Sequence, residues 1–505
     1  MTPFSAQLST FEQLLLVGYF AVMGMLAIYG LHRLFLVWLY QRHRRTVAAL
    51  PAEVTDWPSV TIQLPIFNEI YVVERLLEAV SRIDYPAELL EIQVLDDSTD
   101  ETRSVVAAQI DRLRKQGLSI THLHRTDRTG YKAGALADGL EKARGEFICV
   151  FDADFLPKAD ILRCTLPYFH DPRVGMVQVR WEHLNREYSL LSRVQAIQLD
   201  AHFAIEHAAR NRSGRFFNFN GTAGIWRRVT IEDAGNWQHD TLTEDLDLSY
   251  RAQVRGWRFV YLNDVEAPAE LPVEMSGFRS QRHRWTKGAV QTARKMLGRI
   301  WRSGVPMRAK IEATFHLTAN ISYPLNLCLA ALIFPAMLVR LRTGFEQFLV
   351  LDVPVFLCGT GSVCLYYLLA QRELNRSLWR AVLRLPMVMA IDTSISLNNT
   401  IAVLEGFQRR AGEFVRTPKF SIAAGRKSWH KRIYRGRDSW LYWAELAIGL
   451  YFSVAFMIAV YLRMWPALPF LLLYQGGYLY TGLLSLSQRR QSARPPTMAS
   501  AQVIC

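Results

Sequence analysis

Long apolar runs lie near both ends of this chain, and shorter apolar runs alternate with polar stretches between them. The long runs cover residues 11–40, 313–339, 345–370, 440–462 and 465–486. Each is long enough to cross a bilayer as a helix, which takes ~20 residues. The pattern therefore predicts about five membrane spans and a multi-pass integral membrane protein.

A sixth apolar run, residues 383–407, contains Asp392 and several Ser and Asn residues. Polar residues of this kind are costly in the bilayer core, so we expect an interfacial or re-entrant helix. A sixth span would place the basic segment that follows it outside.

Basic residues set the expected direction of insertion. No Lys or Arg precedes the first apolar run, whereas Arg42-His43-Arg44-Arg45 follows it directly. Because basic loops stay on the cytoplasmic side, we expect the amino terminus outside and the central region in the cytosol. In a bacterium the membrane would be the plasma (inner) membrane.

Residues 59–151 alternate apolar runs with amphipathic stretches. Apolar runs at 60–67, 92–95 and 147–151 predict strands, and Ser98 with Glu101 predicts a helix start with a capping box. Strand and helix in alternation indicate an α/β domain with a mostly parallel sheet. Ligands of such sheets bind at the carboxyl ends of the strands.

Composition fits a hybrid of soluble domain and membrane region, with 50% hydrophobic and 21% charged residues. The net charge of +14 lies largely in short runs beside apolar segments, which favours lipid headgroups over nucleic acid. The six cysteines show no metal-ligand spacing, and we expect free thiols of a reducing compartment or lipid-facing residues.

Asp152 and Asp154 follow an apolar strand, so both carboxylates emerge at one edge of the sheet. Oxygen ligands without a Cys or His set indicate Mg²⁺ or Mn²⁺ rather than zinc, and the metal would hold a diphosphate. The competing interpretation is that acidic residues merely end a strand.

Further motifs follow in order along the chain. They are Asp96-Asp97, Gly130-Tyr131-Lys132-Ala133-Gly134, Asp152-Ala153-Asp154, Phe219-Asn220-Gly221-Thr222-Ala223-Gly224, Thr243-Glu244-Asp245 and Gln281-Arg282-His283-Arg284-Trp285. Over residues 57–285 the chain resembles the cellulose synthase superfamily of processive family-two glycosyltransferases. The likeness is strongest to plant cellulose synthase-like mannan and glucan synthases and their bacterial relatives.

The resemblance implies a GT-A-type α/β glycosyltransferase domain inserted between transmembrane helices. It also implies roles for individual residues. The nucleotide-sugar site would comprise Pro65, Phe67, Glu69, Asp96, Asp97, Lys132, Asp152 and Arg284, with Asp152 and Asp154 as metal ligands. The catalytic pair would be Asp245, as the base, and Glu244; the acceptor site would comprise Asn220, Gly221, Gln281 and Trp285.

Each of these residues also has a purely structural interpretation. Asp96 can close an Asx turn, Lys132 can be solvated, and Asp245 can cap a helix. Residues 281, 284 and 285 share one helix face, which could also be an interfacial basic helix with an aromatic anchor.

Residues 414–419 partly match the superfamily's gating loop, through Phe414, Thr417 and Lys419, with Arg416 departing from its pattern. A charged juxtamembrane loop is the alternative.

The expected division is an anchor at 1–50, a cytosolic domain at 51–300, a membrane region at 301–490 and a tail at 491–505. The expected activity is inverting transfer of a hexose from a nucleotide diphosphate sugar to a growing polysaccharide at the bilayer, with export. From the resemblance, UDP-glucose giving a β-1,4-glucan is the first candidate and GDP-mannose giving a β-mannan is the second. The alternatives are a non-processive transferase acting on a lipid carrier, and a transporter or scaffold with a degenerate domain. Protein partners are left open.

Overall fold

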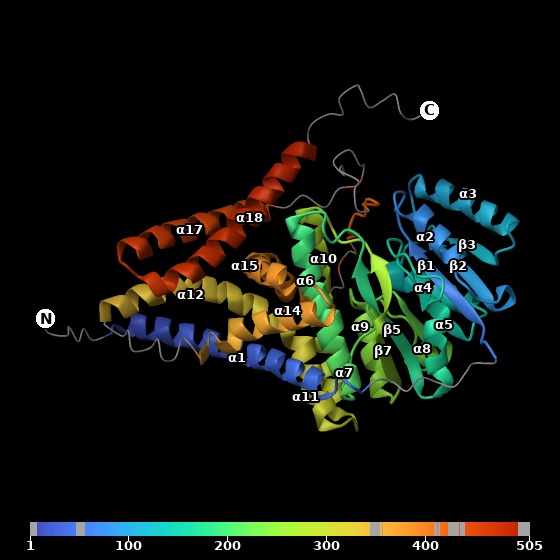
Figure 1. Ribbon diagram of the computed structural model, residues 1–505, viewed down its shortest axis with the longest axis horizontal. Helices are drawn as coiled ribbons and strands as arrows, with labels where there is room; N and C mark the ends of the chain where they lie inside the picture. The colour runs from blue at the N-terminus through green and yellow to red at the C-terminus, as the bar shows by residue number, and fades with distance from the viewer. Residues whose placement is uncertain are drawn as a thin grey trace.

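The computed structural model describes residues 8–46, 56–343, 354–355, 357–408, 412, 415–422, 434 and 440–492. A sheet domain and a long helical region lie side by side, and helices α6 and α10 run between them (Figure 1).

Seven strands form one mixed sheet in the order β3-β2-β1-β4-β6-β5-β7. Their bounds are β1 Val60–Ile66, β2 Leu90–Asp96, β3 Ile120–His124, β4 Phe147–Val150, β5 Val174–His183, β6 Gly224–Arg227 and β7 Arg258–Ala269. Strands β3, β2, β1 and β4 are parallel, as are β5 and β7, whereas β6 is antiparallel to both its neighbours. The mostly parallel α/β sheet predicted from the sequence is confirmed, with β6 as the exception.

Side chains alternate between the two faces of the sheet, because successive residues of a strand point to opposite sides. In β4, Phe147 and Cys149 pack with α2 and α3, whereas Ile148 and Val150 pack with α4 and α6. The helices of this domain are α2 Val73–Ser81, α3 Thr102–Lys115, α4 Tyr131–Lys142, α5 Ile161–Thr165, α6 Leu190–Ala201, α7 Ala208–Arg212, α8 Arg228–Asp233 and α9 Glu244–Val254.

The predicted capping box at Ser98 is wrong. Helix α3 begins four residues later, at Thr102, and its N-cap Glu101 makes no side-chain capping bond. The Ser98 hydroxyl instead accepts a hydrogen bond from the Asn68 backbone N–H at 2.9 Å. Ser98 therefore ties together the loops that follow β1 and β2.

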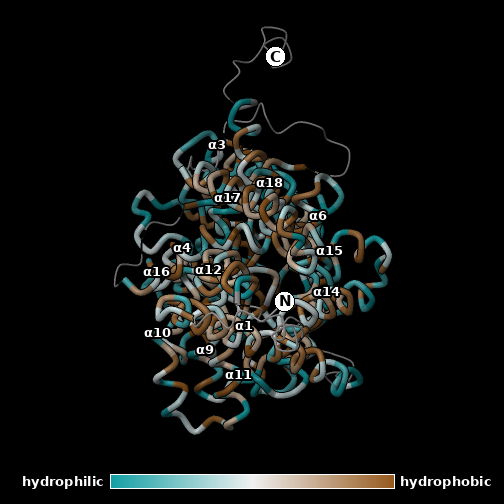
Figure 2. Tube along the Cα trace, turned by 90° about the vertical axis from the view of Figure 1, so that its left-hand side faces the viewer, coloured by the Kyte–Doolittle hydropathy of each residue, from teal (hydrophilic) through white to brown (hydrophobic). Residues whose placement is uncertain are grey.

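The helical region contains the long apolar helices. Its bounds are α1 Thr10–Arg42, α10 Met275–Arg302, α11 Met307–Thr318, α12 Ser322–Thr343, α14 Ser362–Glu373, α15 Leu378–Ser394, α16 Ser396–Gly406, α17 Leu441–Tyr461 and α18 Leu468–Ser492. Short turns of other helix types are η1 Ala87–Leu89, η2 Leu166–His170, η3 His202–His207, η4 Ala319–Ile321, η6 Leu357–Gly361 and η7 Trp465–Ala467. In Figure 2 the end of this region that carries the amino terminus faces the viewer.

Three helical stretches among the described residues are long and apolar enough to cross a membrane: Thr10–Arg42, Met307–Arg342 and Leu441–Tyr461. The bent pair Leu378–Ser394 and Ser396–Gly406 makes a fourth if it is one broken span. The predicted number of five is therefore not confirmed. Residues 345–353 and 356 of the predicted third span lie outside the described residues, and α18 is not among the three.

The bend between α15 and α16 is 40°, and its polar residues are enclosed by protein. Ser396 lies within 3.1 Å of the Tyr478 hydroxyl, and Asn398 donates to the Arg279 carbonyl. Satisfying polar groups inside the protein is what a broken or re-entrant segment requires at membrane depth. This is compatible with the interfacial or re-entrant segment expected from the sequence.

Candidate active site

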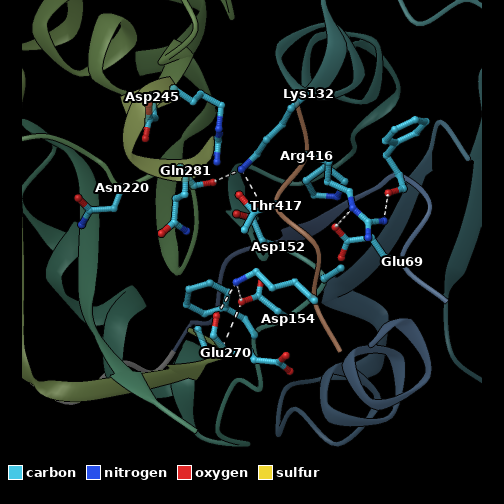
Figure 3. A pocket seen from close by; sticks show the side chains of 18 of the residues that line it. Glu69, Lys132, Asp152, Asp154, Asn220, Asp245, Glu270, Gln281, Arg416 and Thr417 are labelled. Carbon is cyan, nitrogen blue, oxygen red and sulfur yellow. Dashed lines mark hydrogen bonds and ion pairs between the residues drawn. The ribbon is translucent and has the colours of Figure 1, made fainter. Parts of the chain in front are cut away.

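A large pocket lies at the carboxyl ends of β1, β2 and β4, and the whole of it holds about 1230 Å³ of empty space including its open mouth. The lining residues that were predicted from the sequence are Pro65, Phe67, Glu69, Asp97, Lys132, Asp152, Asp154, Asn220, Gly221, Glu244, Asp245, Gln281, Arg284, Trp285, Thr417 and Lys419. Figure 3 shows ten of the lining side chains by label.

Two predicted residues are not in that lining. The Asp96 carboxylate is fully buried, accepts the Ser98 backbone N–H at 2.9 Å and lies 2.8 Å from His122 Nε2. This is the Asx turn that the sequence allowed. Phe414 lies outside the described residues.

Lys132 links the segment that carries Asp152 to the turn that carries Gly221. Its Nζ donates to Asp152 Oδ1 at 2.5 Å and to the Gly221 carbonyl at 2.8 Å. Helix α4 begins just before it, after Gly130 in the left-handed conformation with φ of +76°. Lys132 is therefore an enclosed, paired cation rather than a solvated one.

Gly221 leaves room where a larger residue would not fit. It has φ of +79°, and a β-carbon there would stand 3.1 Å from Asp245 Oδ2 and 3.4 Å from Lys132 Nζ. Glycine is the residue that adopts this conformation without strain. Asp245 Oδ2 and Lys132 Nζ thus both lie close to Gly221.

Asp245 follows the first residue of α9. Its Oδ1 accepts the Leu246 backbone N–H at 2.8 Å, while Thr243 at the N-cap position makes no side-chain capping bond. Burial, together with the neighbouring Glu244 carboxylate, raises the pKa of Asp245 to about 7, against the opposing effect of Lys132. Such a carboxylate is suited to accept a proton near neutral pH.

Asp154 is held from the opposite side of the pocket. Its Oδ2 accepts a hydrogen bond from Lys419 Nζ at 2.6 Å and one from the Glu270 backbone N–H at 3.2 Å. Figure 3 shows the segment that carries Arg416 and Thr417 crossing the pocket, with Asp152 and Asp154 on one side of it and Glu69 on the other.

Glu270 fastens that segment. Its two carboxylate oxygens accept the backbone N–H groups of Phe420 and Ile422, and one of them also accepts Arg75 Nη2 at 2.9 Å. Residues 415–422 are thereby fixed to the end of β7.

Arg416 closes the pocket at β1. Its Nη1 donates to the Phe67 carbonyl at 2.9 Å, and its Nε lies 4.0 Å from Glu69 Oε1. Arg128 lies over the Phe67 ring, with its guanidinium carbon 3.2 Å from the ring centroid. Burial raises the pKa of Glu69 to about 7, because the opposing charge of Arg416 does not offset it fully.

Helix α10 presents Gln281, Arg284 and Trp285 to the pocket, as the spacing of i, i+3 and i+4 predicted. The residues between them face elsewhere: Arg282 donates to Gln198 at 2.7 Å, and His283 lies 3.5 Å from Glu405. The predicted helix is present, and these three residues share the face that lines the pocket.

The carboxylates suit a divalent cation that arrives with a diphosphate. No group of three or more His, Cys, Asp or Glu side chains among the described residues could hold a metal ion by itself. Asp152 and Asp154 supply two hard oxygen ligands, and Mg²⁺ is commonly held by one or two carboxylates plus substrate phosphates. The residues therefore fit Mg²⁺ or Mn²⁺ shared with a ligand.

Sequence reasoning missed Glu270, Arg416, Arg128 and His183 as lining residues. Glu270 alone had a signal, because it follows the end of a strand, as Asp152 does.

Comparison with known proteins places this geometry in context. Residues 58–288 match the family model described as glycosyltransferase like family 2. The chain is 35% identical to glucomannan 4-beta-mannosyltransferase 1 of Oryza sativa subsp. japonica over 74% of this chain and 71% of that protein. It is 39% identical to glucomannan 4-beta-mannosyltransferase 7 of Arabidopsis thaliana over 56% of this chain and 52% of that protein.

The chain spans about half the length of several curated relatives that it matches. Among solved structures, a mannosyltransferase from Pyrobaculum calidifontis in complex with GDP-Man and Mn²⁺ is 23% identical, with a TM-score of 0.49 over 70% of this chain and 97% of that one. A likeness of that size carries no inference about donor or metal.

Proposed function

The chain belongs to the family-two glycosyltransferases, and we propose that it transfers a hexose from a nucleotide diphosphate sugar to a growing β-linked polysaccharide with inversion. One observation carries the proposal: Lys132 and Asp152 lie in the same pocket as Asp245, and Lys132 and Asp245 both adjoin Gly221. A group that holds a diphosphate and a group that accepts a proton are thereby brought together.

The donor end is proposed to stabilise the leaving diphosphate. Asp152 and Asp154 would hold Mg²⁺ or Mn²⁺, which when bound neutralises the charge that develops on the diphosphate. Lys132 and Arg284 would donate charge-assisted hydrogen bonds to the same phosphates. Pro65, Phe67 and Asp97 would enclose the nucleoside, since all three line the pocket beyond the lysine.

The acceptor end is proposed to activate a sugar hydroxyl. Inversion requires that hydroxyl to attack the anomeric carbon from the side opposite the leaving group, so a base must stand on that side. Asp245, with a pKa of about 7, would take the proton, and Glu244 beside it keeps that pKa high. Trp285 would stack on the acceptor sugar, and Gln281 and Asn220 would hydrogen-bond to it.

The relatives favour mannose as the sugar that is transferred. Two of them are named glucomannan 4-beta-mannosyltransferases. We therefore place GDP-mannose, giving a β-mannan, before UDP-glucose, giving a β-glucan.

Residues 415–422 are proposed to act as a gating loop over the donor. Thr417 and Lys419 line the pocket, and Lys419 lies on the acidic residue that would hold the metal. A loop that covers a bound donor excludes water from the reaction.

Export through the helical region completes the proposal, with the division at residues 50, 300 and 490 and the catalytic domain in the cytosol. A polar network adjoins the pocket: Gln198, which accepts from Arg282, donates to Asp392 at 2.7 Å, and Tyr367 donates to Asp392 at 2.8 Å. Polar side chains of this kind are suited to hydrogen-bond with the hydroxyls of a sugar chain. By contrast, Tyr474 and Asn326 bind each other: the Tyr474 hydroxyl donates to Asn326 at 2.8 Å, and this hydrogen bond is structural.

The test is to incubate membrane vesicles with each nucleotide sugar and to digest the product with linkage-specific glycanases. We expect a polymer from GDP-mannose that a β-mannanase degrades, and shorter products from the Trp285→Ala variant. A single sugar on a lipid, with full activity in Trp285→Ala, would replace the processive function by transfer to a lipid carrier.

A further inference from the structure

His207 is a buried histidine that the proposed reaction does not use. It is the last residue of the π-helical turn η3, between α6 and α7, and its side chain is fully buried. The rings of Phe203, Phe217 and Tyr261 surround it, with centroids 5.7, 5.5 and 5.3 Å away. π-helical turns inside helices are often found at functional sites.

The imidazole reaches the loop that carries Gly221. His207 Nε2 lies 2.9 Å from Asn220 Oδ1, and Asn218 Nδ2 donates to the same oxygen at 3.1 Å. A carbonyl oxygen only accepts hydrogen bonds, so Nε2 carries the proton. The Asn220 backbone N–H is fixed as well, because it donates to Gln178 Oε1 at 3.1 Å.

The Asn220 side-chain oxygen already accepts two hydrogen bonds, so the amide nitrogen is the group that is left to bind another partner. Asn220 Nδ2 is buried and has no hydrogen-bond partner among the described residues, although Asn220 lines the pocket. Leaving a buried N–H without a partner costs about 1–3 kcal/mol, so such a group calls for an explanation. Its neighbour Gly221 adjoins Asp245 Oδ2, so Asn220 belongs to the loop beside the proposed base.

We infer that His207 is a positioning residue that orients the Asn220 amide so that Nδ2 donates a hydrogen bond to an oxygen of the acceptor sugar. The inference rests on the proposed function and adds to it the device that holds the acceptor-binding group in place.

The surroundings of His207 keep its imidazole neutral, so that Nε2 remains a hydrogen-bond donor. Burial among aromatic rings, together with the nearby His202, holds the pKa of His207 well below its ordinary value. The imidazole therefore stays neutral, with one proton on Nε2, over the working pH range. Its Nδ1 has no hydrogen-bond partner among the described residues, so Asn220 is the polar group that this side chain serves.

Three variants test the inference. His207→Phe fills the aromatic site but removes the donor, His207→Gln restores an N–H donor, and His316→Phe is the matched control. His316 accompanies Tyr250, 2.7 Å from its hydroxyl, and makes no contact with Asn220. Each variant, in vesicles, is assayed for transfer to a short β-mannan oligosaccharide, for donor KM, and for release of free sugar from the donor.

In His207→Phe we expect the acceptor KM to rise about tenfold, with donor KM and donor hydrolysis unchanged, because one hydrogen bond is lost. His207→Gln should recover most of that loss, and His316→Phe should match the parent. An unchanged acceptor KM in His207→Phe, or a loss in His207→Gln as large as in His207→Phe, overturns the inference. If the parent protein transfers no sugar from any nucleotide sugar, the proposed function fails instead, so the two failures are distinguishable.

Discussion

The carboxylates of Asp152 and Asp154 at one end of the pocket and of Asp245 at the other end have neighbours of opposite charge. At the donor end Asp152 and Asp154 each lie within 2.6 Å of a lysine ammonium, Lys132 and Lys419 respectively. At the acceptor end Asp245 has a carboxylate neighbour, and its pKa is raised to about 7. Asp152 and Asp154 each present an oxygen to a cation, whereas burial beside a second carboxylate favours the binding of a proton at Asp245. The pocket thus separates charge neutralisation from proton removal.

The strongest test of this comparison replaces the proposed base by a residue of the same shape that cannot accept the proton. Asp245→Asn should lower kcat by ~10²–10⁴, because the proton acceptor is lost, while donor binding survives. Turnover and donor binding are measured on the same vesicles. Glu244→Gln, which keeps Asp245, is the matched control and should keep much more activity. Near-parental turnover in Asp245→Asn would place the base elsewhere.

Removal of a metal ligand should affect the other end. Asp154→Ala is expected to lower kcat/KM by about 100-fold, because a metal that neutralises the diphosphate contributes several kcal/mol. Chelation of the parent protein should have the same effect, and added Mn²⁺ should reverse it. Activity that persists in excess chelator would contradict the assignment.

The pH dependence tests the proposed base without a mutation, and donor binding at each pH separates its effect from that of Glu69, whose pKa is also raised to about 7. The pKa of Asp245 is raised, so its carboxylate is protonated below about pH 7 and cannot act as a base there. We expect kcat to fall about tenfold for each pH unit below 7 and to level off above it. A rate profile from pH 5 to 9 tests this, with donor binding at each pH as the control. A flat profile between pH 5 and 7 would remove Asp245 from the role of base.

Local patterns were enough to predict much of this architecture. The strands β1, β2 and β4 follow from short apolar runs, and the pocket-lining face of α10 follows from the spacing of Gln281, Arg284 and Trp285. The capping box at Ser98 failed because a distant backbone group, the N–H of Asn68, takes its hydroxyl. A local pattern cannot show that a tertiary partner competes for the same atom.

The unpredicted parts of the pocket depend on contacts between distant segments. Arg416 reaches the Phe67 carbonyl and Glu270 holds the backbone of Phe420, pairs far apart in the sequence. In the sequence His207 stands between Glu206 and Ala208, and no motif marks it as more than an ordinary core residue. Its contact with Asn220 depends on the π-helical turn, which has no signature in the composition.

The smallest expected effect concerns the segment that crosses the pocket. Lys419→Ala removes the ammonium from Asp154 and, in the proposed closed state, from the donor phosphates as well. The first loss frees a metal ligand and the second weakens donor binding, so we expect the donor KM to rise only about threefold to tenfold. The pH profile should be unchanged, because Asp245 lies at the other end. Lys158→Ala, at an exposed lysine that pairs with Glu266, is the matched control and should leave the donor KM at its parental value. A lower donor KM in Lys419→Ala would mean that the lysine competes with the metal for Asp154 rather than assisting the donor, and the segment would then act as a brake on the donor end alone.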